Sequence, residues 1–209
     1  MSDWIPTESR WRSQLPHWEV RGAWHFVTIR CHGSLPDAAL ERIRGIHDNL
    51  QNIESQSPEF AQLQRQYFLT TEKYLDIGNG FAPFRDAGIG EIAVGAIRKI
   101  ETEGWQLGDG VIMPNHVHLL MRKVSDAGLP LRQALERLKG RSARLINKAL
   151  KRTGRFWQED WFDRWMRDEA EHQRTIQYIR NNPVKAGLCQ DWASFHGRIE
   201  ESTDKENPA

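Results

Sequence analysis

Two histidines stand one residue apart, at His116 and His118, within an apolar run over residues 111–121. Side chains alternate between the two faces of a β-strand, so a strand over this run places both imidazoles on one face. Two neutral imidazoles side by side are half of a site for a divalent metal ion. We therefore predict that the histidines point away from the core, and that the other face is buried. The residues expected on that buried face are Val111, Met113, Val117, Leu119 and Met121.

A second group of polar residues lies in a predicted helix near the C-terminal end. Apolar spacing predicts this helix over residues 168–182, ended by Pro183, because the residue before a proline is pushed out of the helical region. Tyr178 and Asn182 are four residues apart, so they project from the same helix face. Taken alone, a tyrosine at such a place is usually structural, and the asparagine is most simply a residue at a helix end.

The composition indicates a globular protein of a reducing compartment. A chain of 209 residues fits one domain, and 39% hydrophobic with 27% charged residues is typical of a soluble fold. No apolar run approaches the length of a membrane span, and no signal peptide is visible at the N-terminus. The two cysteines do not suggest a disulfide framework. We expect a cytoplasmic protein without a membrane partner.

The net charge of +1 does not indicate a nucleic-acid binder, but the distribution of charge is uneven. Basic residues crowd residues 131–155, where Glu136 is the only acidic residue. Apolar residues recur there at roughly helical spacing, which predicts a basic amphipathic helix, bent near Gly140. Such a helix has either a solvated face or a surface that follows a phosphate backbone. On the second interpretation the candidate DNA contacts are Lys139, Arg141, Arg144, Lys148 and Arg152.

The remaining elements must position these groups. A tryptophan-rich arm precedes a predicted strand over residues 23–31, and a helix begins near Ala38. A helix over residues 89–103 comes before the histidine strand, and an aromatic connector over residues 156–166 follows the basic helix. This order predicts an α+β fold, with an antiparallel sheet and helices on one face.

Residues 51–84 are interpreted as a helical insertion. Pro58 begins a predicted helix, which ends at the turn that starts with Gly78. The charges of the insertion are mixed, which favours a role as scaffold over a lid, a dimer element or a DNA-contacting arm. The tail over residues 201–209 is predicted to be disordered.

Four strings in this order resemble the REP-associated tyrosine transposases. They are MPNHVHLL at 113–120, LKGRSAR at 138–144, FWQEDWFDRWMRDE at 156–169 and YIRNNPVKAGL at 178–188. These proteins belong to the wider superfamily of single-tyrosine HUH transposases, named for a His-hydrophobe-His motif. The resemblance covers most of the chain, from about residue 23 to residue 188.

The resemblance implies a ferredoxin-like α+β fold, here a single HUH domain over residues 1–200. It implies a divalent ion, Mg²⁺ or Mn²⁺, bound by His116 and His118. Tyr178 matches the nucleophile and Asn182 the third metal ligand. The alternatives for the third ligand in a loosely coordinated site are a water molecule, Gln177 or Glu171.

The implied reaction cuts single-stranded or hairpin DNA from palindromic repeats, and leaves a 5′-phosphotyrosine with a free 3′-hydroxyl. The covalent link conserves the energy of the broken bond, so rejoining needs no ATP. An alternative is a host protein that binds chromosomal palindromes without transposition. Histidine-triad nucleotide hydrolases are a poor match, because Leu120 stands at their third histidine position. Both a monomer and a homodimer remain open.

Overall fold

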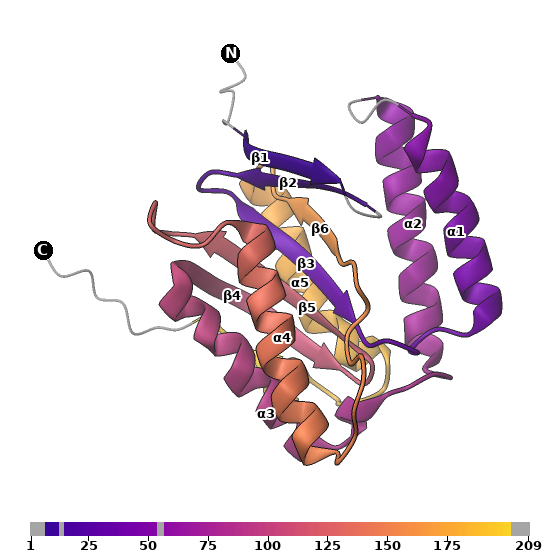
Figure 1. The fold of residues 1–209 in the computed structure, drawn as a ribbon, viewed down its shortest axis with the longest axis vertical. Helices are drawn as coiled ribbons and strands as arrows, with labels where there is room; N and C mark the ends of the chain where they lie inside the picture. The colour runs from indigo at the N-terminus through magenta and orange to yellow at the C-terminus, as the bar shows by residue number, and fades with distance from the viewer. Residues whose placement is uncertain (1–6, 13–14, 54–56, 202–209) are drawn as a thin grey trace, which may run out of the picture.

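The computed structural model describes residues 7–12, 15–53 and 57–201, and Figure 1 shows their arrangement. Within them, a five-stranded sheet has the order β6-β3-β5-β4-β7, and a two-stranded sheet pairs β1 with β2. Every pairing is antiparallel, which confirms the predicted fold class. The strands are β1 (Thr7–Arg12), β2 (Pro16–Val20), β3 (Trp24–Arg30), β4 (Trp105–Met113), β5 (His116–Lys123), β6 (Phe162–Trp165) and β7 (Arg198–Ile199).

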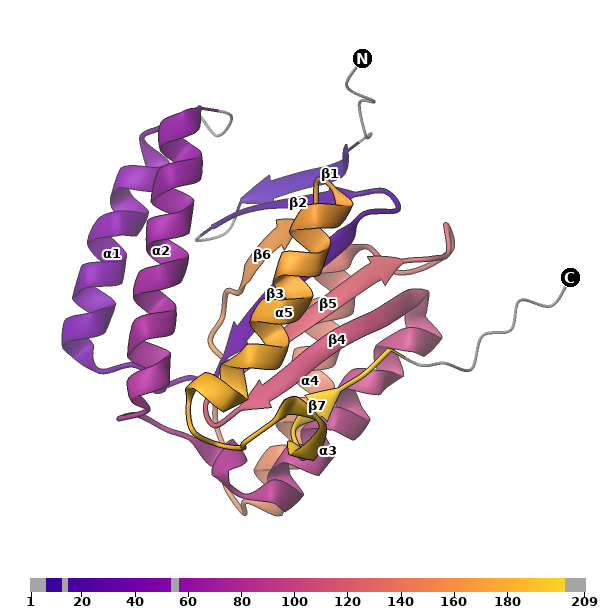
Figure 2. The ribbon, with the colours of Figure 1, turned by 180° about the vertical axis from the view of Figure 1, so that it is seen from behind.

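Helices cover both faces of the larger sheet. In Figure 2, α5 crosses the near face, while α3 and α4 lie behind the strands and the α1–α2 hairpin stands beside the sheet. The helices are α1 (Asp37–Gln51), α2 (Pro58–Ile77), α3 (Ala87–Arg98), α4 (Leu131–Ala149) and α5 (Glu169–Lys185). Short 3₁₀ helices span Pro83–Arg85, Lys99–Glu103 and Trp192–Ser194.

The alternation along β5 explains this layering. Val117 and Leu119 join the main hydrophobic cluster beneath α3 and α4. Leu120 joins a second cluster, which includes Ile179 of α5. Because both faces of the central strands are apolar, each needs a cover. The prediction of helices on one face is therefore wrong for α5, although the antiparallel α+β class holds.

The apolar run that contains the histidines forms two strands and not one. A turn that begins at Pro114 separates them, since proline has no N–H for a strand ladder. Across the hairpin Val111 lies opposite His118, and Met113 lies opposite His116. Residues directly opposite each other point to the same face. The prediction that Val111 and Met113 share the face opposite the histidines is therefore wrong.

The histidines are also buried, whereas the sequence predicted that they point away from the core. His116 is 1% exposed and His118 is 0% exposed. The side chain of His118 stacks on Phe26, with ring centroids 5.3 Å apart, and contacts Tyr178 of α5 and Glu72 of α2. A second layer on this face of the sheet removes both imidazoles from bulk water.

The helix α2 begins and ends as the sequence predicts. Ser57 caps its first turn by accepting a hydrogen bond from the backbone N–H of Phe60, and Pro58 occupies the first turn. Gly78 ends it in the left-handed region, at φ 67°, where a residue without Cβ is least strained. The helix packs along α1, so the two form a hairpin beside the sheet.

Two other helices differ from their predicted form. Pro183 lies inside α5, which continues to Lys185, because a proline in the last turn removes only one intrahelical hydrogen bond. The carbonyl of Pro183 still accepts a bond from the N–H of Leu188 at 2.8 Å. The basic helix α4 runs through Gly140 as a single helix from Leu131 to Ala149.

The predicted tryptophan-rich arm contains the β1–β2 hairpin, and the predicted aromatic connector contains β6. The sequence predicts disorder for residues 201–209. Of these, residues 202–209 lie outside the described ranges. Among the helices of the described ranges, none combines the length and the apolar character that crossing a membrane requires.

Candidate metal and tyrosine site

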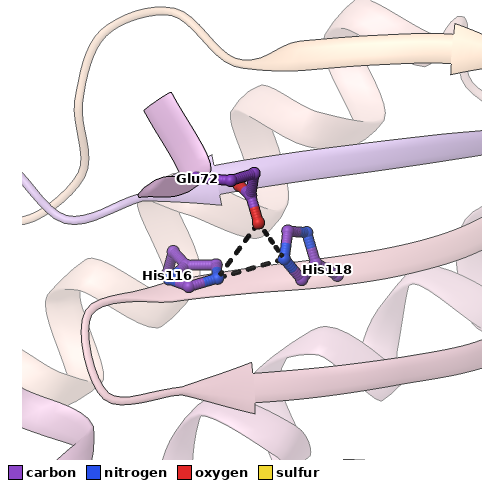
Figure 3. A group of neighbouring side chains, drawn as sticks. All are labelled: Glu72, His116 and His118. Atoms are coloured by element: carbon purple, nitrogen blue, oxygen red, sulfur yellow. Dashed lines mark hydrogen bonds and ion pairs between the residues drawn. The ribbon is translucent and has the colours of Figure 1, made fainter. Parts of the chain in front are cut away.

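Three buried side chains from two distant segments converge on one point, as Figure 3 shows. The Nε2 atoms of His116 and His118 are 3.0 Å apart. The Oε2 atom of Glu72, which α2 supplies, lies 3.0 Å from His118 Nε2 and 4.0 Å from His116 Nε2. All three ligand atoms lie within 4.8 Å of one another. Two imidazoles and one carboxylate at this spacing could hold a metal ion.

The outer nitrogens of both imidazoles are held by neighbours. His116 Nδ1 lies 2.7 Å from the side-chain oxygen of Asn115, which only accepts, so Nδ1 carries the proton. His118 Nδ1 lies 2.8 Å from the hydroxyl of Thr28, which is able to accept in the same way. The amide of Asn115 also donates to the carbonyl of Leu75 in α2, at 3.0 Å. These bonds leave both Nε2 lone pairs facing the point of convergence.

The residues present fit a divalent cation. The two Nε2 atoms lie 3.0 Å apart with Glu72 Oε2 beside them, so a proton or a metal cation among them offsets the repulsion of their lone pairs. Two ligands at a right angle around an ion about 2.0–2.1 Å away stand about 3 Å apart, which matches this spacing. The Oε1 atom of Glu72 is buried and has no hydrogen-bond partner among the described residues. A bound cation would satisfy all of these atoms.

Burial and charge set the protonation of the ligands. Burial, with the charge of His118 as a second cause, lowers the pKa of His116 to about 3, so its imidazole is neutral at physiological pH. Burial alone would raise the pKa of Glu72, but the charge and hydrogen bond of His118 hold it at about 2. A neutral imidazole beside a carboxylate is the state in which these groups bind metal.

Tyr178 brings its hydroxyl to the same atom. Its hydroxyl donates a hydrogen bond of 2.5 Å to Glu72 Oε2, the oxygen that faces both histidines. Burial, reinforced by the charge of Glu72, raises the pKa of Tyr178 well above its usual range. The phenol is therefore protonated at rest, and its oxygen is fixed beside the donor set.

The other predicted ligands lie in different surroundings. Asn182 is buried, and its amide nitrogen donates to the backbone carbonyl of Tyr178 at 3.0 Å. Of the two alternatives, Gln177 is exposed, and Glu171 forms an ion pair with Arg164. A role for Asn182 as metal ligand stays a prediction.

Sequence reasoning missed Glu72, because it interpreted the insertion over residues 51–84 as scaffold. The insertion carries the carboxylate of the site, so that interpretation needs correction. One signal was present. Glu72 stands four residues after Phe68 and three before Leu75, which places a charged residue on the apolar face of the helix. A charge on a buried stripe is rare unless it is paired or binds a metal.

The predicted DNA contacts lie on the other side of the sheet. Their helix, α4, packs through Leu135 and Leu138 on the face away from the histidines. Arg141 forms an ion pair with Glu103 at 2.9 Å, and Lys139 donates to the carbonyl of Glu159.

Of the other predicted contacts, Arg152 stacks on the ring of Phe81, and Arg144 and Lys148 are exposed. Contact between DNA and this helix stays a prediction, and it would lie apart from Tyr178.

Fold and site together place paired histidines on a strand and a helix tyrosine at one point, the arrangement that the sequence motifs predicted. The family model of IS200-like transposases matches residues 91–182, which include His116, His118 and Tyr178 but not Glu72. This match confirms the family resemblance predicted from the sequence motifs. The matched region is similar to IS200-like transposases.

A solved structure of a REP-associated tyrosine transposase bound to a REP hairpin is similar in fold. The TM-score is 0.51 and the identity 15%, over 91% of this chain and 81% of that one. The likeness supports the fold, and it extends the comparison to the segments before residue 91. No curated protein matches the chain.

Proposed function

We propose that this protein is a metal-dependent endonuclease and strand transferase that cuts single-stranded hairpin or palindromic-repeat DNA. Tyr178 is the nucleophile, and His116, His118 and Glu72 hold a divalent cation. One observation carries the proposal: Glu72 Oε2 accepts the hydroxyl of Tyr178 at 2.5 Å and lies 3.0 Å from His118 Nε2. Nucleophile and ligands therefore meet at one atom.

The donor set of two imidazoles and one carboxylate suits Mn²⁺ or Mg²⁺, with water in the remaining positions. When bound, such a cation polarises the scissile phosphate and offsets the negative charge that develops on it. Because all three ligands and the tyrosine come from one chain, a monomer suffices as the catalytic unit. We place the reaction in the cytoplasm.

The residues of the chain account for the covalent step. The Tyr178 oxygen attacks phosphorus, the bond from phosphorus to O3′ breaks, and a 5′-phosphotyrosine forms. Glu72 Oε2 accepts a hydrogen bond from the phenolic hydroxyl and so directs its oxygen, and the proton that the phenol releases is balanced by the one that the leaving O3′ takes up as a free hydroxyl. One P–O bond replaces another, so the reverse attack by a 3′-hydroxyl rejoins the strand without ATP.

Aromatic packing holds the nucleophile in place. The ring of Tyr178 lies 5.9 Å from Phe26 and 5.8 Å from Phe68, measured between centroids. A phenol packed in this way has few rotamers available, so its oxygen stays near the cluster. The same rings keep bulk water from competing for the phosphate.

A covalent-adduct assay tests the proposal. Purified protein is mixed with Mn²⁺ or Mg²⁺ and labelled single-stranded hairpins from the palindromic repeats that flank its gene, and a denaturing gel separates protein-linked from free DNA. We expect an adduct that is absent in Tyr178→Phe and absent with chelator. Glu72→Gln keeps the size of the side chain but removes its charge, and we expect it to weaken Mn²⁺ binding at least 10-fold.

The outcomes separate the candidate functions. Hairpin binding without any adduct, with both metals, would favour the alternative of a non-mobile host protein that binds chromosomal palindromes. An adduct that persists in Tyr178→Phe would assign the nucleophile elsewhere. Unchanged Mn²⁺ affinity in Glu72→Gln would remove Glu72 from the ligand set and return that place to Asn182.

A further inference from the structure

A groove of about 470 Å³ opens beside the nucleophile, between α2, β6 and α5. The α1–α2 insertion forms one wall of it through Arg65 and Phe68, and α5 forms the other through Arg174 and Tyr178. Phe162 of β6 lies in its floor. Its volume falls within the roughly 300–1,000 Å³ of ligand sites in proteins. The groove therefore reaches Tyr178, the proposed nucleophile.

Aromatic rings follow the groove toward the reacting atoms. The ring centroid of Phe162 lies 4.8 Å from that of Phe68, and Phe68 lies 5.8 Å from Tyr178. Tyr178 in turn lies 5.5 Å from His118. Phe68 and Phe162 are only half-buried, so part of each ring faces the groove. Half-exposed rings in a row are what unpaired bases stack on.

The charge of the groove is positive. It is lined by Arg65, Arg164 and Arg174 against a single acid, Glu171, which pairs with Arg164. Arg65 and Arg174 are exposed on opposite walls. Two guanidinium groups that flank a line of aromatic rings complement a strand whose phosphates run along its edges.

We propose that this groove binds the unpaired DNA strand that carries the scissile phosphate. The inference rests on the proposed function, which places that phosphate at Tyr178. A duplex keeps its bases stacked inside and presents no ring faces to Phe68 or Phe162, so the occupant is single-stranded. The insertion thus has two roles: it supplies Glu72 to the cluster, and it builds the wall of the strand groove.

Binding without cleavage tests the groove separately from the chemistry. The background is Tyr178→Phe in chelator, and the probe is a fluorescently labelled single-stranded oligothymidylate, with a duplex of equal length for comparison. The test variant is Arg65→Gln/Arg174→Gln. The matched control is Arg44→Gln/Arg137→Gln, two exposed arginines outside the groove lining, on α1 and α4.

We expect the test variant to bind the single strand about 10-fold more weakly at moderate salt. Log K falls with log salt at a slope of about −0.7 per phosphate contact on a single strand, so losing two contacts should make the slope shallower by about 1.4. The control should keep both the affinity within about 2-fold and the slope. Phe68→Leu, checked for folding by thermal melting, should weaken single-strand binding about 10-fold and leave duplex binding unchanged.

Equal losses in test and control variants would overturn the proposal, as would a larger loss in Arg144→Gln/Lys148→Gln on α4. An equal loss of duplex binding in Phe68→Leu would overturn the single-stranded assignment. The assay involves neither metal nor adduct. If the proposed function fails and the groove holds, no adduct forms but Arg65→Gln/Arg174→Gln still weakens single-strand binding. If the groove fails and the function holds, the adduct forms but this variant binds the single strand as well as the control does.

Discussion

Two buried clusters of histidine and carboxylate lie in this protein, and they have opposite uses. One joins His17 of β2 to Asp160 and to Asp163 of β6. The other joins His116 and His118 of β5 to Glu72 of α2. Both are almost fully excluded from water, and each contains a carboxylate oxygen without a hydrogen-bond partner among the described residues. Burial and composition therefore do not distinguish them.

The direction of the lone pairs does distinguish them. Asp163 and Asp160 bind the Nδ1 and Nε2 atoms of a single ring, which point away from each other. Their oxygens flank the imidazole and do not converge. Burial alone would lower the pKa of His17, but the hydrogen bonds and charges of both aspartates raise it to about 9. His17 is therefore protonated, and its ion pairs with both aspartates hold the β1–β2 hairpin against the sheet.

In the second cluster the Nε2 atoms of two rings face each other at 3.0 Å, with Glu72 beside them. Burial lowers the pKa of His116 to about 3, so this imidazole is neutral at physiological pH. The same residue types therefore make a structural ion pair when one ring lies between two acids, and a candidate metal site when two rings meet one acid.

The largest effect should come from His118→Ala. Loss of a ligand should remove detectable Mn²⁺ binding, at least about 100-fold in affinity, and abolish the covalent adduct. His17→Gln is the matched control, because it alters an equally buried histidine and should leave Mn²⁺ affinity unchanged. Titration followed by electron paramagnetic resonance measures the free Mn²⁺. An equal loss of Mn²⁺ affinity in His118→Ala and His17→Gln would show that the two clusters do not differ in metal binding.

Folding stability should depend more on the His17 cluster than on the His116–His118 cluster, which is the reverse of the order expected for metal affinity. His17→Gln leaves two buried carboxylates without their cation, so we expect the free energy of unfolding to fall by about 3–5 kcal/mol. His116→Gln, in metal-free protein, removes a neutral ring that faces another lone pair and should cost clearly less. Urea denaturation at pH 7 followed by circular dichroism compares the two. A larger loss in His116→Gln would mean that the second cluster is structural.

Stability should also depend on pH through His17. Its pKa rises from 6.5 to about 9 in the folded protein, so folding favours the protonated ring. The stabilisation is complete below pH 6.5 and is lost as the pH rises through about 9, with a total of about 3 kcal/mol. Urea denaturation of wild type and His17→Gln at several pH values isolates it: the difference between them should shrink as pH rises. A constant difference would contradict a protonated His17.

Metal should stabilise the protein through the second cluster alone. Mn²⁺ at 100 times its dissociation constant adds about 2.7 kcal/mol to the free energy of unfolding. For a chain of this size that raises Tm by roughly 5–10 °C. The shift should persist in His17→Gln and vanish in His118→Ala, as measured by differential scanning calorimetry. A shift that persists in both variants would place the ion elsewhere.

The smallest effect should follow Asn115→Ala. Asn115 fixes the tautomer of His116 and ties it to α2, but it does not face the point of convergence. Loss of such a supporting hydrogen bond costs about 10-fold in metal affinity. Calorimetric titration with Mn²⁺ checks the value. An affinity equal to that of wild type would show that packing alone holds the imidazole.

Much of the site was accessible from the sequence because its signals are local. The spacing of His116 and His118 requires a shared face on any strand, and Pro58 with Gly78 marks both ends of α2. Tyr178 stands out only together with the histidine motif. The apolar pattern likewise predicts the antiparallel α+β class, because each strand needs a buried face.

The position of Glu72 was decided by tertiary structure alone. It lies 44 residues before His116 in the chain, since 116 − 72 = 44, and no local spacing relates the two. The same holds for the cover of α5 over the histidine face and for the contact of His17 in β2 with Asp160 and Asp163. Local periodicity determines which face of an element is apolar. Which element covers that face, and which charged groups are buried together beneath it, depends on packing between segments far apart in the chain.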